Sequence, residues 1–213
     1  MNTNLSTHKS FALLNHALFS VGGIFARYFV YGDGSCLFHA IAFALNYREY
    51  RTVISNQQQR NIGIMFRKHI IVQNEWNKFI RLMGFENIAP SFKEVASDCY
   101  FADDFLHNFV ARRLRTAIIV LNSMEDMYFT HDMEHLPDNF PIILVAWIGE
   151  IHFEPIVKTQ NISADAVRPN RFNNRVCDNT NTLQMQSIFC KRDPIIQNII
   201  MACKKTTPKT KAI

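Results

Sequence analysis

Apolar residues recur along this chain at two different spacings, and each spacing indicates a different kind of element. Helical spacing runs from Leu37 to Leu45 and predicts a buried helix. The β-branched apolar run 116–121 predicts a buried strand. Two further runs, 141–147 and 151–157, flank three residues that include Gly149, a pattern typical of a β-hairpin. Helices followed by a strand and a hairpin favour a mixed sheet flanked by helices.

Other helices are indicated by their ends as much as by their periodicity. We expect a helix over 57–74, and helical spacing continues over 75–83 until Gly84, a typical helix end. Ser91-Phe-Lys-Glu94 is a capping-box pattern, and Asp103 is placed to cap a helix over 105–114. The residues expected to form the inward stripe of the first of these helices are Ile62, Met65, Phe66, His69 and Ile70.

The chain divides into three parts on this pattern. Residues 1–24 are interpreted as an N-terminal helical segment, in which Phe11–Leu18 forms a packing helix. Residues 25–158 form the middle part, and 159–213 read as an extension that ends in a basic, disordered tail. Within this extension, the apolar residues of 195–200 are expected to dock on a core or on a partner.

The stretch 31–40, Tyr-Gly-Asp-Gly-Ser-Cys-Leu-Phe-His-Ala, carries the first chemical signal. Gly32 and Gly34 permit a sharp turn close to a ligand, so the loop delivers Cys36 to the first turn of the predicted helix. Free N–H groups and the positive end of the helix dipole stabilise a thiolate there and can bind an oxyanion. The alternative is that Asp-Gly-Ser is an ordinary turn and Cys36 an inert core residue.

A thiolate nucleophile needs a base, and the predicted hairpin supplies one in His152. Alternation along the second strand places Ile151 and Phe153 on one face and His152 and Glu154 on the other. Glu154 can then orient the imidazole, so that a nucleophile, a base and an acid are all present. The alternative is that Glu154 is a solvated strand residue and another polar group orients His152.

Three blocks of sequence, taken in order, resemble a known family. They are Asp-Gly-Ser-Cys-Leu-Phe at 33–38, Tyr-Phe-Ala-Asp-Asp at 100–104 with the helix and strand that follow, and Ile-His-Phe-Glu-Pro-Ile at 151–156. Together they resemble the ovarian-tumour (OTU) family of cysteine proteases, most of which are deubiquitinases. The resemblance covers residues 25 to 158, and it implies that they form an OTU-like catalytic domain.

The chain departs from the family pattern at three places. His39 stands where the family often has arginine, and Phe101-Ala102 replaces Trp-Gly. Glu154 stands where aspartate or asparagine is more usual. In some relatives an acid upstream in the sequence orients the histidine. Asp33 is therefore a further candidate catalytic residue beside Cys36 and His152.

The resemblance implies an α+β, papain-like cysteine-protease fold of OTU type, with a small central β-sheet sandwiched between helices. It implies hydrolysis of the bond after the C-terminal glycine of ubiquitin or a ubiquitin-like modifier. The backbone N–H groups of 33–36 are then expected to hold the oxyanion, which assigns Gly34 and Ser35 to substrate binding. Phe101 and Ala102 are expected to line a narrow channel for the two terminal glycines.

Composition narrows the partners and the compartment. The 213 residues are 48% hydrophobic, enough for one sizeable core. The formal charge is +5, but the basic tail has no interleaved aromatic residues, so we expect no nucleic-acid partner. The apolar run 11–30 is broken by Asn15-His16 and Arg27, which argues against a signal peptide or membrane association.

Cysteine usage favours a reducing, cytoplasmic compartment. The chain has five cysteines, an odd number, and no Cys-x-x-Cys pair, which disfavours a disulfide framework and a zinc knuckle. Abundant Asn, Ile, Phe and Lys are typical of AT-rich genomes. The resulting hypothesis is a viral or bacterial effector that acts in the cytoplasm of a host.

One competing motif lies at His131-Asp-Met-Glu134-His135, which matches an inverted zinc-protease pattern. Zinc chemistry needs both histidines on one helix face and a third ligand downstream. Pro137 follows at once and no apolar stripe runs through the segment, so we interpret it as an exposed polar loop. The sequence predicts neither a metal nor a cofactor.

Two rival functions remain open from the sequence. One is a catalytically silent OTU-like module that only binds ubiquitin. The other is a viral cysteine protease that processes its own polyprotein. The presence of both Cys36 and His152 favours an active enzyme.

Overall fold

A computed structural model describes residues 10–13, 19, 24–46, 50, 56–98, 100–122, 127–149, 151–160, 167–170, 173–177 and 184–206. The helices are α1 (Cys36–Leu45), α3 (Asn56–Ile70), α4 (Gln73–Met83), α5 (Phe92–Val95), α6 (Asp104–Leu114) and α7 (Pro194–Thr206). The strands are β1 (Ser10–Leu13), β2 (Ile24–Tyr28), β3 (Ala117–Asn122), β4 (Met127–Phe129), β5 (Ile142–Ile148), β6 (His152–Gln160), β7 (Val167–Asn170), β8 (Asn173–Cys177), β9 (Gln184–Gln186) and β10 (Ile188–Phe189).

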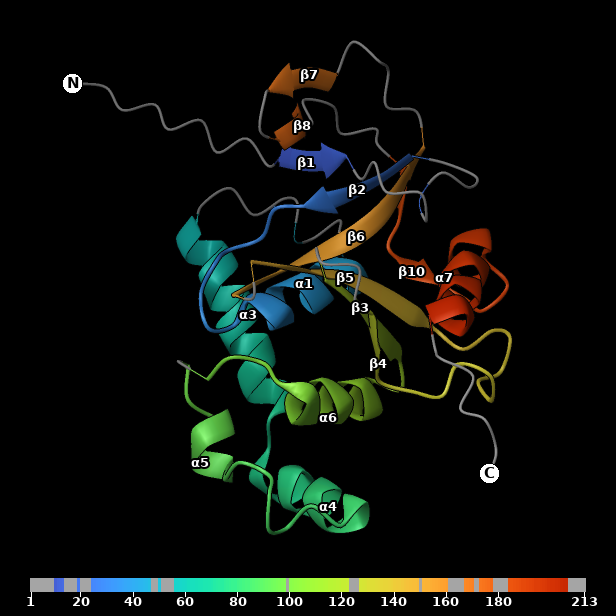
Figure 1. The fold of residues 1–213 in the computed structure, drawn as a ribbon. Coiled ribbons are helices and arrows are strands. Elements are labelled where there is room, and N and C mark those ends of the chain that lie inside the picture. Colours follow the sequence, from blue (N-terminus) through green and yellow to red (C-terminus); the bar gives the residue numbers. More distant parts are fainter. Residues whose placement is uncertain are drawn as a thin grey trace, which may run out of the picture.

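The described strands form one mixed sheet with helices on both faces (Figure 1). The strand order is β4-β3-β5-β6-β2-β1-β8-β7, while β10 pairs with β5 and β9 pairs with β6. Strands β3 and β5 run parallel, and β5 and β6 run antiparallel. The predicted α+β sandwich is confirmed, although this sheet, with ten strands, is larger than the small sheet that we expected.

Alternating side chains of β3 and β5 build two cores, one on each face of the sheet. Ile118 and Val145 pack with α1, α4 and α6 on one face. Ile119 and Leu144 pack with α7 on the other face. Strand residues that are apolar at every position suit this arrangement, because both faces of the sheet are covered.

Several local predictions are confirmed. The hairpin is β5–β6, with Ile148 paired to His152 and Gly149 at a φ of 55° in the turn. Gly84 ends α4 in the left-handed conformation. Ser91 and Glu94 form the reciprocal capping box, and the Asp103 carboxylate caps α6.

Two local predictions are wrong. Ser10–Leu13 is a strand, β1, and not part of a helix, because it pairs with β2 and with the distant β8. The remainder of the predicted Phe11–Leu18 helix lies outside the described residues. The helix predicted over 57–74 ends at Ile70, and α4 begins at Gln73 after a break.

The inward stripe of α3 also differs from the prediction. Met65 and His69 are exposed, whereas the fully covered positions are Gln59, Gly63, Arg67 and Ile70. The buried face of α3 is therefore mostly polar or glycine. Its neighbours include the cysteine loop (residues 31–36) and His39 of α1. The predicted stripe is right in part, because Ile70 is buried and Ile62 and Phe66 pack partly buried against the cores.

The segment after residue 158 contributes to the sheet and to one core. Strands β9 and β10 pair with β6 and β5, and Ile195, Ile196 and Ile199 of α7 are buried in the core that α7 shares with the sheet. The expectation that these isoleucines dock on a core is confirmed. The division into 1–24, 25–158 and 159–213 stays a prediction. Among the described residues, no helix has the length and apolar character needed to cross a membrane.

Candidate active site

Cys36 is the first residue of α1 and lies at the end of the cysteine loop. Its side chain is 2% exposed, and its Sγ lies 4.0 Å from the carbonyl oxygen of Ile151. Ile151 directly precedes His152, so the fold brings the predicted nucleophile to the start of the strand that carries the predicted base. Docking of α1 on the start of β6 therefore creates the site.

His152 lies with one ring edge toward the cysteine loop and the other toward Glu154. A Cβ placed on Gly32 would be 3.7 Å from both Nδ1 and Cε1 of His152, an ordinary van der Waals distance, so the loop backbone lies next to the ring. The opposite nitrogen, Nε2, is 3.7 Å from Oε1 of Glu154. This arrangement leaves Nδ1 on the side of the nucleophile's loop.

Glu154 is buried between two basic side chains. Besides its contact with His152, its Oε2 lies 3.3 Å from Nη1 of Arg27, a residue of β2. Strand β2 pairs with β6, and this pairing sets Arg27 beside Glu154. Arg27 balances the negative charge of a carboxylate that is only 7% exposed. The prediction did not include Arg27, because it depends on strand pairing.

Asp33 lies inside the cysteine loop and contacts His39 rather than His152. Its Oδ1 accepts a hydrogen bond from the Ser35 N–H at 2.8 Å and lies 3.4 Å from Nε2 of His39. Its Oδ2 is 3.7 Å from Nε of Arg60. Burial alone would raise the pKa of Asp33, but the hydrogen bonds from His39 and Ser35 lower it below its ordinary value.

His39 is a buried part of this site that the sequence did not assign. It is 0% exposed, and its Nδ1 lies 3.0 Å from the hydroxyl of Tyr50. A Cβ on Gly63 of α3 would lie only 2.2 Å from the His39 ring, so α3 packs against the imidazole through bare backbone. His39 thus stands where the family pattern has arginine and makes the contact to Asp33.

The electrostatics favour a neutral thiol and a neutral imidazole at rest. Burial raises the pKa of the Cys36 thiol above its ordinary value, despite hydrogen bonds from backbone groups of Phe153 and Leu37 that lower it. Burial lowers the pKa of His152, with smaller contributions from His39 and Arg27. His152 is therefore in the form that can accept a proton at neutral pH.

The cysteine loop uses two of its own N–H groups internally. The Ser35 N–H donates to Asp33 Oδ1, and the Cys36 N–H donates to the Asp33 carbonyl at 3.0 Å. Both were expected to hold the oxyanion together with the N–H groups of Asp33 and Gly34. In this conformation an oxyanion would have to share them with the turn.

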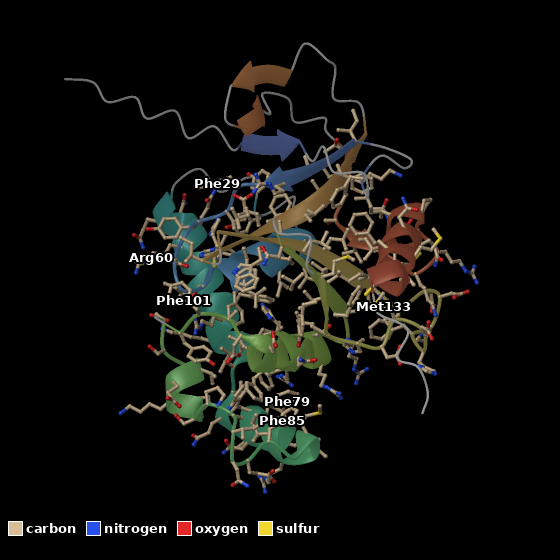
Figure 2. The ribbon with its side chains drawn as sticks, in the orientation of Figure 1. Phe29, Arg60, Phe79, Phe85, Phe101 and Met133 are labelled. Atoms are coloured by element: carbon tan, nitrogen blue, oxygen red, sulfur yellow. The ribbon has the colours of Figure 1, made fainter. Side chains whose placement is uncertain are left out.

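A pocket of about 460 Å³ adjoins the site on the side of Ile151 and Phe153. Phe101 is 58% exposed at this pocket, and Ala102 is half-buried beside it. Phe29 and Phe101 lie along the same side of the molecule (Figure 2). An exposed aromatic side chain is thus available at the position predicted to contact substrate.

His107 lines the same pocket from α6. It is 4% exposed, and neither ring nitrogen has a hydrogen-bond partner among the described residues. Burial lowers its pKa to about 4. The imidazole is therefore neutral, and its edge-on contact with Phe153 places it against the strand of the candidate base.

The His-x-x-Glu-His segment forms turns between β4 and β5, away from this site. His131 Nδ1 lies 3.0 Å from the Thr130 hydroxyl, and His135 Nδ1 lies 2.7 Å from Asp132. Within the described part of the chain, no group of three or more His, Cys, Asp or Glu side chains could hold a metal ion.

Comparison with known proteins adds the fold. No family model and no curated protein matches the sequence. A solved ovarian tumour (OTU) domain in complex with ubiquitin matches with a TM-score of 0.51 and 15% identity, over 94% of this chain and 92% of that chain. The chain has the OTU fold.

Other solved OTU domains match over less of this chain. The OTU domain of OTUD1 matches with a TM-score of 0.45 and 14% identity, over 62% of this chain and 85% of its own. The viral OTU domain protease of Qalyub virus matches with a TM-score of 0.42 and 12% identity, over 68% and 97%. At these identities the OTU likeness concerns the fold, and the chemistry must be argued from the site itself.

Proposed function

We propose that this OTU-fold chain is a cysteine protease that hydrolyses peptide or isopeptide bonds after the C-terminal glycine of ubiquitin or a ubiquitin-like modifier. The observation that carries the proposal is the position of Cys36 at the start of α1, against the residue that precedes His152, with Glu154 behind the imidazole. The solved OTU domain in complex with ubiquitin supports the choice of modifier.

The proposed reaction begins with a neutral pair. Cys36 Sγ attacks the carbonyl carbon of the terminal glycine while its proton passes to His152, which Glu154 stabilises as the imidazolium. Collapse of the tetrahedral intermediate forms a thioester, and the proton on His152 goes to the leaving amine. Water then attacks the thioester carbon while its proton passes to His152. The C–S bond breaks, the modifier leaves with a free carboxyl group, and the proton on His152 returns to Cys36 Sγ.

The proposed substrate path runs beside the pocket at Phe101 and Ala102. The exposed aromatic face of Phe101 suits contact with a glycine-ended tail, whose backbone can lie flat against it. The proposed location is the cytoplasm, including that of a host cell, where ubiquitin conjugates are found.

A second candidate is a module that binds ubiquitin without cleaving it. Two observations support this alternative: burial raises the pKa of Cys36, and the Ser35 and Cys36 N–H groups are engaged inside the loop. In the first candidate, substrate binding would have to free these N–H groups for the oxyanion.

The test uses a ubiquitin probe with a C-terminal electrophile and a panel of di-ubiquitins. The proposal expects labelling and cleavage by the unaltered chain, and loss of both in Cys36→Ala, with a rate loss of at least about a thousandfold. Cys190→Ala, which removes a free thiol remote from the site in sequence, is the control and should behave as the unaltered chain.

Binding of ubiquitin without labelling would favour the silent module. Cleavage of a peptide bond in a longer precursor of the chain, without cleavage of ubiquitin chains, would favour a polyprotein-processing protease. Cleavage that survives in Cys36→Ala would contradict the assigned nucleophile.

A further inference from the structure

Arg67 lies on the buried face of α3 and reaches the cysteine loop. The side chain is 1% exposed, and its guanidinium lies 5.3 Å from the centre of the Phe38 ring. Nη1 donates to the Gly34 carbonyl at 2.6 Å and lies 3.5 Å from the Ser35 hydroxyl. A positive charge that is almost wholly removed from water is costly unless its hydrogen bonds are well made.

The other end of the same guanidinium holds a different segment. Nη2 donates to the carbonyls of Val95, at 2.9 Å, and Tyr100, at 3.1 Å. Val95 ends α5, and Tyr100 directly precedes Phe101 and Ala102 at the pocket. One planar group therefore ties the cysteine loop, on Nη1, to the wall of the pocket, on Nη2.

The bond to Gly34 also fixes a backbone donor next to the nucleophile. The Gly34 carbonyl and the Ser35 N–H belong to one planar trans peptide, so they point in opposite directions. While Arg67 holds the carbonyl, the Ser35 N–H is directed at Asp33 Oδ1, which it contacts at 2.8 Å. A flip of this peptide would have to break both bonds.

We propose that Arg67 is a positioning residue that sets the cysteine loop and the pocket wall in one fixed relation. It acts through Gly34 and Tyr100 and does not contact the substrate. Lysine cannot replace it, because a single ammonium lacks the two separated nitrogens that reach the two segments at once. A test of Arg67 by ubiquitin cleavage rests on the proposed function, whereas a test by amide hydrogen exchange of the backbone does not.

The backbone test is amide hydrogen exchange in Arg67→Ala and Arg67→Lys. We expect faster exchange in two separate segments, 33–37 and 100–103, with the rest of the sheet unchanged. Added ethylguanidinium should restore slow exchange in Arg67→Ala by refilling the vacated site, and ethylammonium should not. Arg67→Lys keeps the positive charge. If Arg67→Ala does not fold, hydrogen exchange is measured in Arg67→Lys alone, and we expect faster exchange in at least one of the two segments.

The turnover test compares kcat and KM for ubiquitin cleavage. We expect kcat/KM to fall by about 100-fold in Arg67→Ala, the scale of a small misplacement of reacting groups. Ethylguanidinium should recover part of the loss, which a merely structural role would not produce. The control is Val110→Ala, which makes a cavity on α6 in the apolar core that also contains Phe38 and Val95. It should lower the melting temperature while keeping kcat/KM.

Two results would overturn the proposal. One is unchanged exchange at 33–37 and 100–103 in a folded Arg67 variant. The other is a loss of kcat/KM in Arg67→Ala that is no larger than in Val110→Ala at the same drop in melting temperature, without response to ethylguanidinium. If the unaltered chain cleaves no ubiquitin conjugate, the proposed function fails, and the exchange experiment still decides the role of Arg67.

Discussion

Glu154 lies between His152 and Arg27, and its charge is expected to matter more than its shape. In Glu154→Gln the amide keeps the size of the side chain but cannot stabilise an imidazolium. Turnover of di-ubiquitin should fall tenfold or more, as when the acidic member of a triad is neutralised. Glu75→Gln, which removes the acid of the ion pair with Arg113, is the matched control and should leave turnover unchanged.

Turnover within about twofold of the unaltered chain in Glu154→Gln, with His152→Ala inactive, would contradict a role for Glu154 as orienter. The site would then be a dyad of Cys36 and His152.

The pH dependence should reveal the neutral resting pair. Burial lowers the pKa of His152 below its ordinary 6.5, so the imidazole loses its proton at lower pH and the acid limb of kcat/KM should lie below pH 6.5. Burial raises the pKa of Cys36 above 9.0, so alkylation by iodoacetamide should keep rising with pH beyond 9.0.

Arg27→Gln provides the internal check on this prediction, because the Arg27 charge contributes to the lowered pKa of His152. Its removal should move the acid limb toward higher pH. A plateau of alkylation at neutral pH in the unaltered chain would instead indicate a thiolate–imidazolium pair.

The residues with a local signature were the ones that the sequence could identify. Cys36 follows a turn with two glycines, and His152 and Glu154 stand two apart on a strand, so short patterns could nominate each of them. The approach of Cys36 to His152 depends on docking of α1 on β6 across 115 residues. Arg27 and Arg67 have no such pattern. Their positions depend on pairing of β2 with β6 and on docking of α3, and one sequence does not reveal either.

At the scale of elements, the contact between α1 and α3 depends on a glycine. Gly63 lies in the middle of α3, where alanine would ordinarily favour the helix by about 1 kcal/mol. Its Cβ would lie 2.2–2.5 Å from three atoms of the buried His39 ring. We therefore expect Gly63→Ala to lower the free energy of unfolding by about 1–3 kcal/mol, measured by chemical denaturation.

A double-mutant cycle tests the cause. In the His39→Ala background the clash is gone, so Gly63→Ala should become neutral or stabilising. An equal loss in both backgrounds would show that His39 is not the obstacle.

Elements with their own end signals were predicted well, and those that depend on distant partners were not. The capping box at Ser91, the Asp103 cap and the Gly84 stop each involve residues within one turn. Strand β1 depends on β8, more than 150 residues away along the chain, and its apolar residues alone were equally compatible with a helix. The buried face of α3 was predicted only in part, because Arg67 and Gly63 are buried there as well as Ile70.

At the scale of the whole molecule, the segment after Lys158 covers one face of the sheet. Deletion of this segment would expose apolar residues that α7 now buries, such as Ile119 and Leu144. We expect a lower soluble fraction after centrifugation, with catalysis retained in what stays folded, because the candidate catalytic residues all precede residue 158. Met201→Asp, at an exposed site on α7, is the control and should stay soluble.

A truncated protein that remains as soluble and as stable as the full chain would contradict the covering role of α7. A truncated protein that folds but no longer cleaves ubiquitin would place the segment after Lys158 in the substrate site.

The thiol of Cys36 touches a carbonyl that lies 115 residues further along the chain. On the ribosome, the proposed nucleophile therefore emerges well before the proposed base, and the two meet only after the β5–β6 hairpin has been made and docked on α1. During that interval the thiol has no imidazole beside it to accept its proton. In the proposed function, a chain that has not finished folding therefore cannot cleave ubiquitin, and a ubiquitin probe with a C-terminal electrophile counts only folded molecules.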